Sequence, residues 1–233
     1  MKQITILFIL FSGILLFPKL GQALSFDGSN DYVIVGDSNS LDLINNFTIS
    51  AWINTNTIND ITHRIIHKNS AYTFYIDSAS SRLGIYHYGT TVYAYSSDNS
   101  LSAGAYYHVV YVQSSVNGVA FYINGIAKGG NSAYTGNVPT NVNPINIGLD
   151  EDLVSFPFNG LIDEVRVYNR VLSASEIRGL YGGWNIRNGL VGYWRLLGTS
   201  LVFEPDWSGL KNHGKATNGP VRSALSRVLR FRR

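Results

Sequence analysis

The chain has 233 residues, of which 14% are charged, and its formal net charge is +3. It contains no cysteine, which excludes disulfide bonds, thiol catalysis and every zinc site that uses a thiolate. Its 15 Tyr, 11 Phe and 23 Gly suit many short strands separated by tight turns. Length and composition together favour one all-β sandwich with an appendage.

The first 23 residues have the pattern of a secretory signal peptide. Lys2 precedes an apolar stretch from Ile4 to Phe17, and small residues allow cleavage after Ala23. A membrane span needs about 20 apolar residues, so an uncleaved anchor is the alternative that fits less well. We therefore expect a secreted, extracellular protein that loses residues 1–23 and has no membrane span in its mature form.

Charge divides the rest of the chain into an acidic body and a basic tail. Residues 24–183 contain 7 Lys and Arg against 13 Asp and Glu, a net of −6, whereas residues 184–233 contain 9 against 2, a net of +7. A basic end of this kind favours a solvated, poorly packed tail over a patch that binds nucleic acid or a membrane surface. We expect a domain over 24–183 and a tail over 184–233.

The mature protein begins with two strand patterns and a turn. Residues 24–35 predict a strand, a Gly-Ser-Asn turn with Asp27 and Asp31 at its ends, and a second strand. Residues 47–53 predict a strand whose odd positions are apolar, so Trp52 points to the opposite side. Trp52 either meets the second sheet or lines a groove.

The middle of the chain predicts hairpins. Residues 72–76 and 83–88 pair across a turn at 78–81, and residues 92–95 follow as the next strand. The side chains expected on the core face are Tyr72, Phe74, Ile76, Leu83 and Ile85. Those expected on the other face are Tyr75, Tyr86, Tyr88, Tyr93 and Tyr95. The second set is either a structural row of cross-strand aromatic pairs or a platform on which sugars stack.

The clearest strand pattern runs from Phe158 to Tyr168. Its alternation places Asp163 on an otherwise apolar face, where a carboxylate is costly unless it is paired or bound to a metal. Ser173 and Glu176 then have the spacing of a capping box, which predicts a short helix that ends at Gly182-Gly183.

These segments resemble the laminin G-like jelly roll, a branch of the concanavalin A-like lectin and glucanase superfamily. The matching segments are LSFDGSNDYVIV, FTISAWINT, FYINGIAKGG and NIGLDED followed by FNGLIDEVRVYNRVLSASEIRGLY, in this order and spanning roughly 24–183. The resemblance implies an all-β, antiparallel, two-sheet jelly-roll sandwich with one short C-terminal helix.

The tail also resembles part of this family, as the lead-in to a further repeat that the chain does not complete. We expect it to be loosely ordered, and at best a hairpin docked on the sandwich. The residues expected to make that contact are Leu190, Val191, Tyr193 and Trp194.

The resemblance further implies a structural calcium ion, bound by oxygen atoms where the first turn meets the strand that contains Asp163. The matching residues are Asp27, Gly28, Asp31 and Asp163. Hard cations take 6–8 oxygen ligands, which backbone carbonyls and water can complete. The alternative is that Asp163 accepts hydrogen bonds from turn amides or pairs with an arginine.

We expect this protein to recognise a carbohydrate or an extracellular protein without catalysis. The expected ligand-binding residues are Trp52, Tyr75, Tyr86, Tyr88, Tyr93 and Tyr95, and the acidic loop 150–152 is a further candidate. Glucanases of this fold use alternating carboxylates on one strand, and neither Glu151 nor Glu164 lies in such a run, so no catalytic residue is expected. The alternatives are a structural or adhesion module of a surface assembly and, more remotely, a glycan-active enzyme. Specific binding of nucleic acid is not expected.

Overall fold

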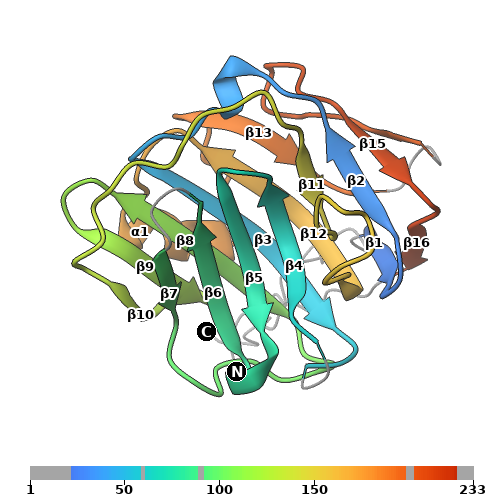
Figure 1. Ribbon diagram of the computed structural model, residues 1–233, viewed down its shortest axis with the longest axis horizontal. Helices are drawn as coiled ribbons and strands as arrows, with labels where there is room; N and C mark the ends of the chain where they lie inside the picture. The colour runs from blue at the N-terminus through green and yellow to red at the C-terminus, as the bar shows by residue number, and fades with distance from the viewer. Residues whose placement is uncertain (1–21, 59–60, 89–91, 198–201, 225–233) are drawn as a thin grey trace, which may run out of the picture.

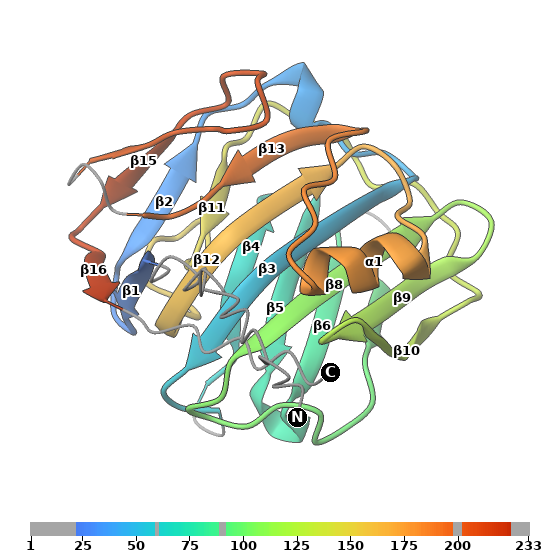
Figure 2. The ribbon, with the colours of Figure 1, turned by 180° about the vertical axis from the view of Figure 1, so that it is seen from behind.

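The computed structural model describes residues 22–58, 61–88, 92–197 and 202–224 (Figure 1). Two antiparallel sheets lie face to face, and one α-helix lies across the outer face of one of them (Figure 2). This confirms the predicted all-β sandwich with a single short helix. The signal peptide prediction lies almost entirely outside the described residues. Within those ranges, no helix is long and apolar enough to cross a bilayer.

The sheet under the helix, sheet A, has the strand order β10-β9-β8-β3-β12-β1-β16 in the described part of the chain, and β13 also pairs with β12. Its strands are β1 (Gln22–Asp27), β3 (Phe47–Thr55), β8 (Tyr107–Ser114), β9 (Gly118–Ile123), β10 (Ile126–Asn131), β12 (Asn159–Tyr168), β13 (Leu190–Trp194) and β16 (Val221–Ala224).

The second sheet, sheet B, has the order β14-β15-β2-β11-β4-β5-β6-β7 over the same described ranges. Its strands are β2 (Tyr32–Val35), β4 (His63–Lys68), β5 (Tyr72–Asp77), β6 (Arg82–His87), β7 (Val92–Tyr95), β11 (Ile145–Ile147), β14 (Phe203–Glu204) and β15 (Gly214–Thr217). Two short 3-10 helices, Asn39–Leu41 and Ser78–Ser80, lie in the connections.

The main core lies between the sheets and follows the predicted alternation. The odd positions of β3 are buried in it, and so is the core-facing set of β5 and β6. These side chains are Phe47, Ile49, Ala51, Ile53, Tyr72, Phe74, Ile76, Leu83 and Ile85. Removing this much apolar and aromatic surface from water is the main favourable contribution to folding of a domain that has no disulfide.

The helix α1 (Ala174–Tyr181) starts where the capping box predicts. The Ser173 side chain accepts a hydrogen bond from the Glu176 amide, and the Glu176 carboxylate accepts one from the Ser173 amide. Past its end, Gly183 has φ +91°, the left-handed conformation that stops a helix. Ile177 and Leu180 pack with residues of β8 and β12 in a second, smaller core on the outer face of sheet A.

A β-bulge in β12 changes which of its residues face the core. Between Asp163 and Arg166, β12 contains one residue more than β3, and Glu164 at this point has φ +52°. The extra residue reverses the alternation. The core residues are therefore Ile162, Val165 and Val167. Asp163 pairs with Trp52 and shares the outer face of sheet A, so the prediction that it lies on the apolar face is wrong.

The segment after α1 is part of both sheets as far as Ala224, which corrects the expectation of a loosely ordered tail. The four residues predicted to dock, Leu190, Val191, Tyr193 and Trp194, are indeed buried, but they belong to β13 in sheet A. β15 then pairs with β2 in sheet B, and β16 pairs with β1 in sheet A. Apolar burial stabilises this packing, because Trp194, Leu196 and Ala216 of this segment are buried.

Candidate functional site

The five tyrosines predicted to share one side of the hairpins do so, on the outer face of sheet B. We call this set, Tyr75, Tyr86, Tyr88, Tyr93 and Tyr95, the tyrosine face. The Tyr93 and Tyr95 rings are nearly parallel, at 7° with centroids 6.4 Å apart, and Tyr93 is 53% exposed. Tyr86 contacts Tyr93 at 4.5 Å and Tyr88 at 4.7 Å. The rings form a continuous aromatic surface that runs to the edge strand β7.

Tyr75 belongs to this face but is almost fully covered. It lies opposite Gly84 in the β5–β6 pairing, and a Cβ atom at Gly84 would come within 2.5 Å of its ring, so only glycine permits this approach. Its ring packs edge-on against Tyr95, and the Arg64 guanidinium lies 5.4 Å from its centroid. Burial raises the pKa of Tyr75. Tyr75 therefore supports the other rings and presents little surface of its own.

A cavity of about 270 Å³ adjoins the tyrosine face. Its polar lining includes His67 of β4, Asn146 of β11 and Glu151 of the loop before β12. The His67 ring packs against Tyr88 with centroids 6.1 Å apart, so one residue of the cavity lining contacts the tyrosine face. Flat rings next to convergent polar side chains are the usual composition of a small-molecule site.

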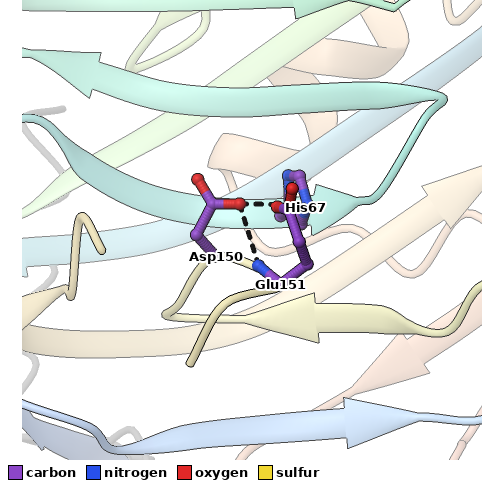
Figure 3. A group of neighbouring side chains, drawn as sticks. All are labelled: His67, Asp150 and Glu151. Atoms are coloured by element: carbon purple, nitrogen blue, oxygen red, sulfur yellow. Dashed lines mark hydrogen bonds and ion pairs between the residues drawn. The ribbon is translucent and has the colours of Figure 1, made fainter. Parts of the chain in front are cut away.

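Within the described residues, His67, Asp150 and Glu151 form a group with metal-ligand spacing, all ligand atoms lying within 4.8 Å of one another (Figure 3). We call it the His67 cluster. The Nε2 atom of His67 lies 2.6 Å from a Glu151 oxygen and 3.2 Å from an Asp150 oxygen, yet makes no well-aligned hydrogen bond. Its Nδ1 is 2.7 Å from the Thr73 hydroxyl, which fixes the ring. Arg64 binds the other oxygen of Asp150 at 2.8 Å.

Burial lowers the pKa of His67 to about 4, more than the nearby Asp150 raises it. At neutral pH the imidazole is therefore uncharged, and its approach to two carboxylates is not an ion pair. A neutral imidazole nitrogen with two carboxylates suits Zn²⁺ or Mn²⁺ better than Ca²⁺, which prefers oxygen.

The residues predicted to bind calcium fall into two separate places. Asp27, Gly28 and Asp31 lie together at the turn between β1 and β2, where both carboxylates accept hydrogen bonds from turn amides. Asp27 pairs with Asn159 of β12, so Asp163 lies four residues further along that strand, about 13 Å away at the usual rise per residue. One cation, with bonds of about 2.3–2.6 Å, cannot bind both places.

Trp52 is likewise not part of the tyrosine face. It lies on the outer face of sheet A, where its ring stacks on Tyr181 of α1 at 5.7 Å and 25°. It lines a cavity there, which is the groove alternative for this residue. The other lining residues of this cavity and the His67 cluster were not predicted, because each site joins side chains that are far apart in the sequence.

Residues 27–178, roughly two thirds of the chain, match a laminin G family described as the concanavalin A-like lectin/glucanases superfamily. The chain therefore belongs to this superfamily, as the resemblance implied. A search of curated proteins found no match.

Solved structures with the same fold include a putative carbohydrate binding protein from Bacteroides ovatus, with 20% identity and a TM-score of 0.72 over 89% of this chain. The chain spans 60% of the length of that protein. Domain 4 of the extracellular arabinanase AbnA from Geobacillus stearothermophilus, solved with arabinotriose, has 20% identity and a TM-score of 0.54 (71% of this chain, 79% of that one). The CBM40 domain of a Ruminococcus gnavus sialidase, solved with sialyllactose, has 18% identity and a TM-score of 0.53 (69% and 98%).

Proposed function

We propose that this protein is a secreted, non-catalytic recognition module that binds a saccharide on its tyrosine face. The observation that carries the proposal is the pair of parallel rings at Tyr93 and Tyr95, continued by Tyr86, next to a cavity with polar walls. Sugars offer an apolar ring face for stacking and hydroxyl groups for hydrogen bonds, and this surface supplies partners for both. The saccharide complexes of the arabinanase and sialidase domains support the same class of ligand.

A glycan array followed by calorimetry tests the proposal. We expect at least one glycan to bind, and Tyr93→Ala to weaken its affinity about tenfold, because an aromatic contact contributes about 1 kcal/mol beyond its buried area. Tyr93→Phe keeps the ring and should keep most of the affinity. Ile126→Ala, at a 63% exposed position on the edge of sheet A, is the control and should bind normally.

If no glycan binds but a surface protein does, the adhesion module becomes the better description. If the chain releases reducing ends from its best ligand, and Glu164→Gln or Glu151→Gln stops the release, it is an enzyme. Either result overturns the proposal.

A divalent cation remains part of the proposal, and the His67 cluster is where the donor atoms converge. Nε2 of His67 is fully buried and directed at two carboxylates without an aligned hydrogen bond. A cation there would hold the loop of Asp150 and Glu151 against β4 and so fix the polar wall of the cavity. Calcium at the first turn is a separate proposal that has to rely on Asp27, Gly28 and Asp31 without Asp163.

Secretion is tested by the mature N-terminus, which we expect at Leu24. Cleavage there would remove the first two residues of β1, while Leu24 and Ser25 keep their pairs with both β12 and β16. Mass spectrometry that finds Met1 on the exported protein would contradict the signal peptide.

A further inference from the structure

A second cavity, of about 490 Å³, lies on the opposite side of the sandwich from the tyrosine face. Its lining residues come from the outer face of sheet A, from α1 and from the segment after it. Figure 2 shows α1 lying across this face of the sheet. Nine of its twelve lining residues lie beyond residue 178, outside the part of the chain that matches the family. We call it the tryptophan cavity, because Trp52, Trp184 and Trp207 line it, three of the four tryptophans in the chain.

The aromatic rings of the tryptophan cavity are of two kinds. Trp52 is buried at its base against Tyr181, whereas Trp184 is 65% exposed and Trp207 is 46% exposed. Trp184 is held in place by Gly179 of α1, where a Cβ atom would come within 2.5 Å of the indole ring. Its amide also donates to the Gly179 carbonyl at 2.8 Å. Exposed indoles in fixed positions around a cavity are suited to stacking on a ligand.

The charged residues that line this cavity are three arginines and one glutamate, a net of +2. Glu164 binds Arg166, accepts a hydrogen bond from the Tyr193 hydroxyl at 2.7 Å, and lies 3.6 Å from Arg195. This single carboxylate therefore balances about one of the three guanidinium groups. The Nε atoms of Arg166 and Arg195 are buried and make no hydrogen bond.

Two of the three arginines, Arg187 and Arg195, contact Trp207. Arg187 donates to the Trp207 carbonyl at 2.7 Å, and the Arg195 guanidinium lies 5.6 Å from the centroid of the Trp207 ring. Guanidinium groups bind carboxylates through paired, charge-assisted hydrogen bonds. A ligand whose ring stacks on an indole would place a carboxylate substituent within reach of these groups.

We propose that the tryptophan cavity binds an acidic saccharide, one whose ring carries a carboxylate in the manner of a uronic acid. The cavity volume lies within the usual range for a small-molecule site, and its walls supply both ring faces and positive charge. This site is independent of the tyrosine face, so each can exist without the other.

Tryptophan fluorescence tests the proposal directly, because three of the four indoles line the cavity. Oligosaccharides of glucuronic acid and of glucose form a matched pair of probes that differ in the carboxylate. We expect a saturable change in fluorescence with the acidic probe and at least about tenfold weaker binding of the neutral one, since a charge-assisted pair exceeds the 1.4 kcal/mol that a factor of ten requires. Equal affinity for both probes, or no binding of the acidic one, would overturn the proposal.

Three variants locate the site. Trp184→Ala changes an exposed side chain, so it should leave the fold intact and abolish most of the acidic-probe affinity. Arg187→Gln should remove the preference for the acidic probe and leave the weak affinity for the neutral one. Tyr93→Ala, the variant that tests the tyrosine face, should leave the fluorescence titration unchanged. Loss of acidic-probe binding in Tyr93→Ala, with normal binding in Trp184→Ala, would place the ligand on the other face and refute this assignment.

Discussion

The two outer faces of this sandwich are formed in different ways. The tyrosine face lies on neighbouring strands of one sheet, inside the segment that matches the family, and all five of its side chains are uncharged. The tryptophan cavity combines two strands, the helix and the C-terminal segment, and it has excess positive charge. A single sheet can present a row of side chains by its period alone, whereas a walled, charged cavity needs elements from several parts of the chain.

The greatest loss of stability is expected from a change at Trp194, in the C-terminal segment. This side chain is fully buried, and its Nε1 donates to the Asn212 carbonyl at 2.7 Å. Trp194→Ala should lower the free energy of unfolding by about 4 kcal/mol, through lost burial and the cavity that remains. Denaturant unfolding measures this, with Trp184→Ala as a surface control. A loss below about 1 kcal/mol would show that the C-terminal segment does not pack as described.

The next prediction concerns how the stability of the fold depends on pH through the buried His87. Burial lowers the pKa of His87 to about 4 from its ordinary 6.5, and its Nε2 lies 2.7 Å from the Tyr111 hydroxyl in the core. As the pH falls, the unfolded chain takes up this proton near pH 6.5, whereas the folded chain takes it up only near pH 4. The free energy of unfolding should therefore decrease by roughly 3 kcal/mol between pH 6.5 and pH 4, and should not depend on this group above pH 6.5. His87→Gln should flatten this part of the profile. An equally steep profile in that variant would contradict the assignment.

A cation at the His67 cluster would bind on the tyrosine-face side of the sandwich and stabilise the native state as a whole. Zn²⁺ at 100 times its dissociation constant should raise the free energy of unfolding by about 2.7 kcal/mol, and EDTA should reverse this. His67→Gln is the matched variant and should show no increase. Calorimetry that detects binding of equal strength in this variant would locate the ion elsewhere.

The smallest effect tests the wall of the tryptophan cavity. Ser173→Ala removes the cap of α1 and should lower the free energy of unfolding by about 1 kcal/mol. We expect acidic-probe binding to weaken in Ser173→Ala while the tyrosine face is unaffected.

The Glu176 carboxylate gives a second test of the same helix. The Arg170 side chain, with the Ser173 bonds, lowers the pKa of Glu176 to about 2. Its ionisation therefore stabilises the fold above pH 4.5, and this contribution is lost as the pH falls toward 2. Acid titration of Glu176→Gln should lose that part of the pH dependence.

Local patterns predicted most of the strands and the helix correctly. The apolar odd positions of β3 and the Ser173–Glu176 capping box depend on residues a few positions apart. The tyrosine face followed from the same two-residue period. The bulge at Glu164 was not predicted, because no residue type there indicates an inserted position, and the predicted placement of Asp163 on the apolar face was therefore wrong.

Alternation and turn residues act over short distances, so the amino-acid sequence alone was enough to predict the sandwich, the family and the side on which the tyrosines lie. The folded chain was needed to show that His67 contacts Asp150 and Glu151, that Trp52 faces the helix, and that the C-terminal segment completes both sheets. These contacts arise from pairing between distant strands, such as β15 with β2, and the register of that pairing depends on the burial achieved by the whole fold.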